Sequence, residues 1–258
     1  MIKKAIYFCL FKIINRFQNF ILIQVKAWLN IYISNLTNDV IQDGIFKGQK
    51  LSNYSWWSNS DKANILLGLY EQEVQSVIIN NHKNFVNFVD IGAADGYYLF
   101  GLSELNYFQN YIAFEASEIG KSVIENEIIK KGYKNIKCYG KADTNFINQI
   151  DLTVNNLILC DIEGYEYEIF NEDNLKKLNK NLIIIEIHSK NVQNFNHKYN
   201  ILLETASKFF NIEEIYTSSR DFSKLNFINQ LNDNQRWLLC SEGRSNLGCW
   251  LVLYPKIH

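Results

Sequence analysis

The chain has 258 residues, of which 47% are hydrophobic and 21% are charged, a composition typical of a folded globular protein with a full core. Its formal net charge is −1, but residues 1–38 hold five basic residues and no acidic one, which leaves 21 basic and 27 acidic residues in the rest. This mildly acidic body argues against nucleic acid as the substrate, because phosphate binding needs a basic surface.

The basic residues near the N-terminus belong to a segment, residues 1–34, whose apolar residues form a wide face at helical spacing. Its uncharged stretches fall short of the roughly 20 residues that a membrane span requires. We expect residues 1–50 to form a basic amphipathic helical arm and residues 51–258 to form the main domain. The sequence leaves three uses of the arm open. It could pack on the body, pack on a second copy in a homodimer, or lie on an anionic membrane surface.

Seven short apolar runs follow in the main domain. They predict strands over residues 85–91, 111–115, 135–139, 157–161, 182–187, 212–217 and 249–254. Amphipathic segments between them predict helices over residues 96–105, 119–131, 145–150, 165–178 and 197–210, and residues 218–243 are predicted to be irregular.

Apolar strands that alternate with helices indicate a parallel sheet buried on both faces. No obvious crossover helix precedes the last strand, so we expect it to run antiparallel at or near an edge. The predicted fold is a doubly wound, mostly parallel, Rossmann-like α/β fold with a seven-stranded sheet, helices on both faces and a helical N-terminal extension. Such sheets bind ligands beyond the carboxyl ends of their strands.

The loop after the first predicted strand, DIGAADG from Asp90 to Gly96, lies at such a position. Gly92 and Gly96 permit a tight turn and a close approach of the backbone to a ligand. A dinucleotide fingerprint would need a small residue in place of Tyr97, and the carboxylates of Asp90 and Asp95 would repel a pyrophosphate. Two carboxylates suit a cation better, and S-adenosylmethionine carries a sulfonium and an α-ammonium group.

Two further acidic residues follow the next strands. Glu115 ends the second strand, where a carboxylate can accept hydrogen bonds from both ribose hydroxyls. Dinucleotide enzymes use an acidic residue at a similar place, so Glu115 supports S-adenosylmethionine only together with the loop. Asp143 follows the third strand and could bond the adenine amino group, or equally could cap the next helix.

Three segments in order resemble a known family. VDIGAADGYY (residues 89–98) resembles the first motif of class I S-adenosylmethionine-dependent methyltransferases, although Ala94 stands where glycine is frequent. LCDIEGYE (159–166) resembles the D-(I/V)-E-G-x-E segment of the FkbM-type branch, and IIIEIH (183–188) resembles the following strand of that branch. The resemblance covers about residues 84–190 and implies O-methylation of sugars, polyketides and related hydroxylated compounds.

The loop, the strand ends and the resemblance together predict a set of residues that bind the methyl donor. They are Asp90, Gly92, Ala93, Asp95, Gly96, Tyr98, Glu115, Ala116, Asp143 and Asp161. Within this set Asp161 could position either the methionine ammonium or the acceptor hydroxyl.

Asp161, Glu186 and His188 are the predicted catalytic residues, because they follow the fourth and fifth strands and should meet at one sheet edge. A hydroxyl acceptor must lose a proton, and His188 is the candidate base since an unperturbed imidazole titrates near neutrality. The alternative for His188 is a histidine that only caps a strand. The three residues could also hold a divalent ion that acidifies the hydroxyl, but their spacing is not diagnostic and a metal is not favoured.

Predicted acceptor-binding residues lie mostly outside these motifs. They are Trp57, Glu163, Arg220, Arg236 and Arg244. Aromatic faces and arginine forks commonly meet sugar rings and diphosphates, although packing tryptophans and surface arginines would give the same pattern.

We therefore expect an S-adenosylmethionine-dependent O-methyltransferase that acts on a sugar or nucleotide-sugar in surface polysaccharide biosynthesis, such as that of a capsule or lipooligosaccharide. The acceptor class rests on the resemblance alone. The widely spaced cysteines include no C-x-x-C pair, which favours the reducing cytoplasm. The basic N-terminal arm could hold the protein at the inner face of the membrane. Two alternatives stay open: an N-methyltransferase of a small amine or amide, and a non-catalytic nucleotide-binding module docked through the N-terminal helix.

Overall fold

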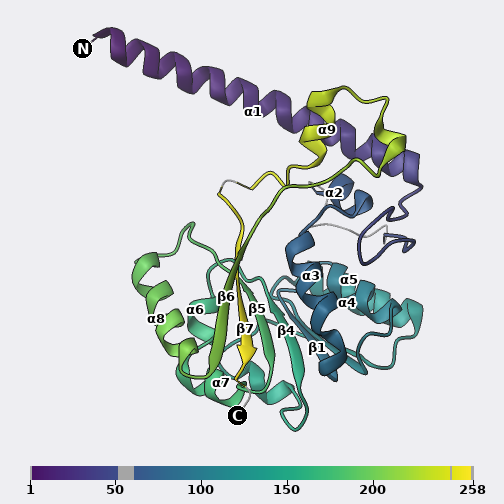
Figure 1. Ribbon diagram of the computed structural model, residues 1–258, viewed down its shortest axis with the longest axis vertical. Helices are drawn as coiled ribbons and strands as arrows, with labels where there is room; N and C mark the ends of the chain where they lie inside the picture. The colour runs from purple at the N-terminus through teal and green to yellow at the C-terminus, as the bar shows by residue number, and fades with distance from the viewer. Residues whose placement is uncertain (1, 52–60, 245, 257–258) are drawn as a thin grey trace. The chain divides into compact units, whose positions relative to one another are not determined.

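The computed structural model describes residues 2–51, 61–244 and 246–256, and Figure 1 labels its helices and strands. The chain divides into two compact units. The described residues of Met1–Leu51, Ser58–Tyr70 and Ser219–Gly243 form the helical unit, and those of Ser52–Trp57, Glu71–Ser218 and Arg244–His258 form the sheet unit. A domain boundary at residue 50 stays a prediction.

The sheet unit contains the predicted seven-stranded sheet. In spatial order its strands are β3 (Ile136–Tyr139), β2 (Asn110–Phe114), β1 (Asn87–Ile91), β4 (Asn156–Cys160), β5 (Leu182–Glu186), β7 (Cys249–Pro255) and β6 (Phe210–Tyr216). β7 is antiparallel to both of its neighbours, and the other pairs are parallel. The Rossmann-like fold is therefore confirmed, with the last strand one place in from the edge.

The central strands determine where a ligand can bind. β1, β4 and β5 are buried along their whole length, which explains their unbroken apolar sequences. Ile91 lies opposite Phe114 of β2 and Cys160 of β4, so these three strands end level with one another. The residues that follow them therefore meet at one edge of the sheet.

Helices lie on both sides of this sheet, as predicted. Their bounds are α3 (Gln72–Asn81), α4 (Tyr97–Glu104), α5 (Glu118–Lys131), α6 (Glu166–Ile169), α7 (Glu172–Lys177) and α8 (Phe195–Ser207), with short 3-10 helices η2 (His82–Asn84) and η3 (Phe146–Gln149). Figure 1 shows α3, α4 and α5 on one side and α6, α7 and α8 on the other. The single helix predicted over 165–178 is instead α6 and α7, because the Asn171 side chain accepts the backbone N–H of Asn174 and starts a new helix.

The segment predicted to be irregular, 218–243, contains two helices, so that prediction was wrong. They are η4 (Asn226–Ile228) and α9 (Asp233–Leu239). A capping box starts α9: the Asn232 side chain accepts the backbone N–H of Gln235, and the Gln235 side chain accepts that of Asn232. The Asn-x-x-Gln spacing was the signal for this helix in the sequence.

The predicted N-terminal helix is confirmed as α1 (Ile2–Thr37), and the helical unit continues with α2 (Lys62–Leu67). Leu29 and Ile33 of α1 are fully buried. Other apolar side chains of α1 are exposed, namely Phe20, Ile21, Leu22, Ile23, Trp28, Ile31 and Leu36. None of the helices in the described part of the chain combines the length and apolar character needed to cross a bilayer. A role for α1 on a second copy or on a membrane surface stays a prediction.

Candidate functional site

A cavity of about 260 Å³ lies at the carboxyl ends of the parallel strands, lined by residues that follow β1, β2, β3 and β4. We call it the strand-tip cavity. Predicted site residues that line it are Gly92, Glu115, Ala116, Asp161 and Glu163. Parallel strands that end level bring these residues together although they are far apart in the sequence.

The loop after β1 forms one wall, and its backbone requires glycine. Gly92, Ala94 and Gly96 have φ angles of 89°, 51° and 83°. A Cβ atom on Gly92 would lie 1.8 Å from the carbonyl oxygen of Asp161, so no larger residue fits against the β4 loop. Gly96 precedes the first residue of α4, and its left-handed conformation turns the chain into that helix.

Glu115 connects the loops at the ends of β1 and β2. Its Oε2 accepts the backbone N–H of Ala94 at 2.7 Å, and its Oε1 accepts that of Ser117 at 2.6 Å. A Cβ atom on Gly120 would lie 2.9 Å from Glu115 Cγ, so the glycine lets α5 pack closely against this side chain. Each carboxylate oxygen retains a lone pair, so the fixed carboxylate can still accept hydrogen bonds from a ligand.

Four other predicted donor-binding residues, Asp90, Ala93, Asp95 and Gly96, shape the β1 loop and are not among the described residues that line the cavity. Asp90 is buried, with 4% of its surface exposed. Burial, followed by the negative charge of Glu115, raises the pKa of Asp90 to about 8. Asp90 is thus protonated at neutral pH unless a cation is bound nearby.

Tyr98 and Asp143 are likewise not among the described residues that line the cavity. The Tyr98 hydroxyl donates to Glu71 Oε2 at 3.0 Å. Asp143 is exposed, and its Oδ1 accepts the backbone N–H of Asn145 at 2.7 Å. This contact is an Asx turn and not a helix cap, because Asn145 is the N-cap of η3 and no described side chain caps that helix. Roles of these two side chains at the donor stay predictions.

Several residues that the sequence did not single out line the cavity. They are Ala94, Phe114, Ser117, Lys141, Ala142, Ile162 and Tyr165. Lys141 Nζ lies 4.2 Å from the centroid of the Tyr165 ring, so the β3 and β4 loops meet through a cation–π contact. The only signal for them in the sequence was their closeness to the end of a predicted strand, since each lies within a few residues of one.

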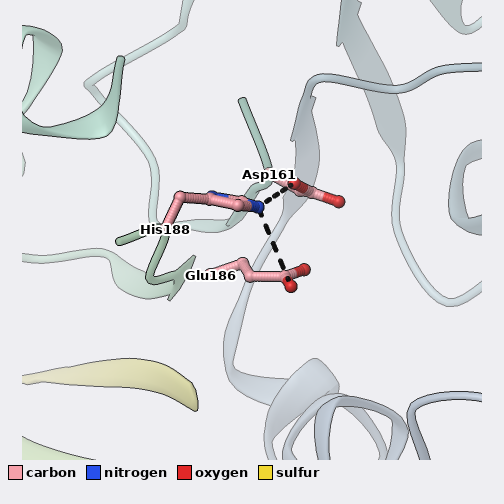
Figure 2. A group of neighbouring side chains, drawn as sticks. All are labelled: Asp161, Glu186 and His188. Atoms are coloured by element: carbon pink, nitrogen blue, oxygen red, sulfur yellow. Dashed lines mark ion pairs between the residues drawn. The ribbon is translucent and has the colours of Figure 1, made fainter. Parts of the chain in front are cut away.

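His188 lies among four carboxylates, and we call the five residues the His188 cluster: Asp161, Glu163, Glu166, Glu186 and His188. His188 Nε2 is 3.4 Å from Asp161 Oδ1, 3.6 Å from Glu163 Oε2 and 3.9 Å from Glu186 Oε1. On the other side of the ring, Nδ1 is 3.5 Å from Glu166 Oε1. Figure 2 shows Asp161 and Glu186 with their carboxylates near the same ring nitrogen. The structure thus brings the three predicted catalytic residues together.

Charges and burial shift the ionisation of this cluster. Burial lowers the pKa of His188, but the adjacent Glu166 carboxylate and the charges of Asp161 and Glu186 outweigh it and raise the pKa to about 9. Burial raises the pKa of Asp161 and of Glu186 in turn. His188 therefore carries a proton at neutral pH in the free protein, unlike the unperturbed imidazole assumed from the sequence.

Arg244 connects the cluster to Glu71. Its Nη2 donates to Glu71 Oε1 at 2.6 Å, its Nη1 donates to Glu186 Oε1, and its guanidinium carbon lies 5.0 Å from the Trp250 ring centroid. Arg244 was predicted to bind the acceptor. These contacts show that it neutralises two buried glutamates, and its role in acceptor binding stays a prediction.

Three other residues were predicted to bind the acceptor. Two of them lie outside the sheet unit, and the third is not among the described residues. Arg220 and Arg236 belong to the helical unit. There Arg220 forms a buried ion pair with Glu242 at 2.5 Å, and Arg236 donates to the carbonyl of Leu231 at 2.9 Å. Trp57 lies outside the described residues.

A family model described as the methyltransferase FkbM domain matches residues 57–223, which include every strand tip described above. The chain belongs to this family. It is a methyltransferase, and its methyl donor is S-adenosylmethionine. The family resemblance inferred from the sequence is thereby confirmed.

Solved structures of other bacterial proteins share part of this fold at low sequence identity. Precorrin-6y C5,15-methyltransferase from Geobacter metallireducens is 11% identical at a TM-score of 0.47, with 72% of this chain and 90% of that chain covered. A Streptococcus pneumoniae protein in complex with S-adenosyl-L-methionine is 16% identical at a TM-score of 0.46, with 71% and 73% covered. A comparison with curated proteins found no match.

Proposed function

We propose that the strand-tip cavity binds S-adenosylmethionine and that the enzyme methylates a hydroxyl of a sugar or nucleotide-sugar. The carboxylates of Glu115, Asp161 and Glu163 at the cavity give it the negative charge that suits a sulfonium and an ammonium group. Glu115 is held by two backbone N–H groups in a position to receive the ribose hydroxyls.

One observation carries the proposal of an oxygen acceptor: the cavity and the His188 cluster share Asp161 and Glu163. A group of charged side chains thus adjoins the space in which the methyl group would be presented. An amine can attack from its neutral form without such help, whereas a sugar hydroxyl is a weak acid and needs its proton removed or its oxygen charge stabilised.

The reaction is a displacement at carbon. The acceptor oxygen forms a bond to the methyl carbon, the carbon–sulfur bond breaks, and its electron pair leaves with neutral S-adenosylhomocysteine. The hydroxyl proton passes to the His188 cluster. Asp161, Glu186 and His188 are the proposed catalytic residues, and of these Asp161 lines the cavity. Alignment of the donor and the acceptor supplies most of the rate enhancement that proton removal does not provide.

Acceptor binding is proposed for Glu163, whose side chain is 67% exposed beside the cavity, and for Arg244. Trp57, Arg220 and Arg236 remain proposals from the sequence. A negatively charged nucleotide-sugar would fit a pathway that builds a surface polysaccharide.

The test has two stages. Calorimetry with S-adenosylhomocysteine measures the donor site, and absence of binding would refute it. Nucleotide-sugars and small amines are then supplied with S-adenosylmethionine, and products are followed by mass spectrometry for the gain of one methyl group. We expect methylated sugars only. If only amines are methylated, the acceptor atom is nitrogen and the proposed oxygen acceptor is wrong.

A matched pair of variants tests the cluster. Asp161→Asn is expected to lower turnover by about a hundredfold or more and to weaken donor binding much less, because Glu115 and Glu163 remain at the cavity. Lys198→Gln, which removes only an exposed ion pair with Glu168, is expected to retain full turnover. Equal turnover in the two variants would exclude Asp161 from the chemistry.

A further inference from the structure

We propose that Asp161, Glu186 and His188 bind one divalent cation of the Mg²⁺ or Mn²⁺ type. Two carboxylates and one imidazole offer three ligand atoms, and the hard oxygen ligands favour this type of ion over softer ones. Figure 2 shows the three side chains converging from the ends of β4 and β5.

The spacing of the ligand atoms suits a single ion. One ligand atom from each residue can be chosen so that all lie within 4.8 Å of one another, and the Asp161 Oδ1 to His188 Nε2 distance is 3.4 Å. Two ligands bound to one ion at about 2.0–2.3 Å lie roughly 3–4.5 Å apart, depending on the angle between them. Small side-chain movements are therefore enough to close the site.

A buried carboxylate lies behind the imidazole ring, close to Nδ1 but not hydrogen-bonded to it. Glu166 is fully buried, and its Oε1 accepts the backbone N–H of His188 at 3.0 Å and faces Nδ1 at 3.5 Å. Its Oε2 accepts the backbone N–H of Gly164 at 2.8 Å, which fixes the carboxylate. A carboxylate behind one ring nitrogen directs the other nitrogen at the ion and strengthens it as a ligand.

Asp161 provides a separate indication. Its Oδ1 is buried and makes no hydrogen bond with any described residue, although 39% of the whole side chain is exposed. Its nearest charged neighbour is the imidazole of His188 at 3.4 Å, an ion-pair contact that is not a hydrogen bond. Buried carboxylate oxygens in native proteins normally accept a hydrogen bond or bind a cation, so this oxygen has room for a stronger partner. A cation in the centre of the triad would supply it.

The local charge also favours a cation. Glu163 and Glu166 add two carboxylates around the triad, and Arg244 is the nearby cation that contacts Glu186, but it also pairs with Glu71. Five carboxylates are thus balanced by one guanidinium and one imidazole. A divalent ion bound beside Arg244 would offset part of this excess, because His188 must give up its proton when it binds the ion.

The ion would have a defined task, which rests on the function proposed above. Bound to Asp161, it lies at the edge of the strand-tip cavity. There it would stabilise the oxygen charge that develops on the acceptor hydroxyl, and Glu163 of the His188 cluster would take the proton.

The experiment uses the full chain after treatment with a chelator, with Mn²⁺ as the probe and its electron paramagnetic resonance signal as the readout. We expect one Mn²⁺ per chain, displaced by excess Mg²⁺. His188→Gln and Asp161→Asn should each weaken Mn²⁺ binding about tenfold or more. Glu168→Gln, an exposed carboxylate of α6 that pairs only with Lys198 among the described side chains, should bind Mn²⁺ as the wild type does.

Thermal melting in the absence of metal identifies any variant that fails to fold, and Asp161→Asn decides the result if His188→Gln is unfolded. The proposal is overturned if the wild type binds no Mn²⁺ or if the variants bind it as tightly as the wild type. If the protein binds one Mn²⁺ but methylates no sugar, the proposed ion site stands and the proposed acceptor is wrong. If the enzyme without metal methylates sugars at the full rate, the proposed acceptor stands and the proposed role of the ion is wrong.

Discussion

The ends of β1 and β2 hold their acidic side chains in a different way from the ends of β4 and β5. At the first pair, Glu115 is fixed by backbone N–H groups of the adjacent loops. At the second pair, Glu186 and Asp161 face His188 and Arg244, which are themselves ionisable or charged. The first arrangement depends on backbone conformation, whereas the second depends on a balance of charges among side chains.

This difference predicts distinct responses to substitution. Changes of backbone conformation should damage the β1–β2 end most, and changes of charge should damage the β4–β5 end most. Four predictions test the contrast, from the largest expected effect to the smallest.

Gly92→Ala should cost more than about 3 kcal/mol of unfolding free energy, because the new Cβ would overlap the Asp161 carbonyl oxygen at 1.8 Å. Gly132→Ala is the matched control, since Gly132 also has a positive φ, of 70°, but has open space around it, and its cost should be about 1 kcal/mol. Urea unfolding measures both. Equal losses would show that the contact between the β1 and β4 loops is unimportant.

Arg244→Met should cost about 2–4 kcal/mol, because it leaves Glu71 and Glu186 buried without their shared cation. Lys208→Met, which removes an exposed ion pair with Glu172, should change stability by less than about 1 kcal/mol. Adding Glu71→Gln to Arg244→Met should recover part of the loss. If the double variant is no more stable than Arg244→Met, the charge balance is not what Arg244 provides.

Asp90→Asn should change how stability depends on pH. The pKa of Asp90 is raised from 3.8 to about 8 by burial and then by Glu115, so the folded state holds a proton that the unfolded state has lost between these values. Stability of the wild type therefore falls as pH rises from about 4 to about 8.

The variant lacks this contribution, so its stability should fall less over the same range, with a gain of roughly 1–2 kcal/mol over the wild type at pH 8. Chemical unfolding at a series of pH values gives both curves. Curves that run parallel would mean that Asp90 ionises normally in the folded chain.

Ala94→Gly should have the smallest effect, within about 0.5 kcal/mol. Relief of the positive φ of 51° at Ala94 is offset by the greater freedom of glycine in the unfolded chain. Calorimetric melting and donor titration of the variant measure stability and affinity. A loss above about 1 kcal/mol would show that the Ala94 methyl group packs against something essential.

The same contrast explains what could be predicted. The β1 loop and Glu115 were predictable because an apolar run, two glycines and a carboxylate at a strand end are local patterns, and parallel strands bring their ends together. α9 could also have been predicted from its capping box, whereas Lys141 and Tyr165 carry no local signature beyond their distance from a strand end.

Arg244 could not be placed from the sequence. Its predicted role in acceptor binding is untested, and the sequence could not show its contact with Glu71, which is 173 positions away in the chain. Likewise, the sequence placed His188 near Asp161 and Glu186 but could not show that carboxylates raise its pKa, because that shift depends on distances of a few ångströms and on burial.

The amino-acid sequence by itself determined the seven strands, the turn at Gly92 and the family, since these follow from periodicity and short motifs. Only the tertiary structure decided which charges share the space at the ends of β4 and β5. The physical reason is range: backbone preferences act between neighbours in the chain, whereas ion pairing and desolvation act between neighbours in space.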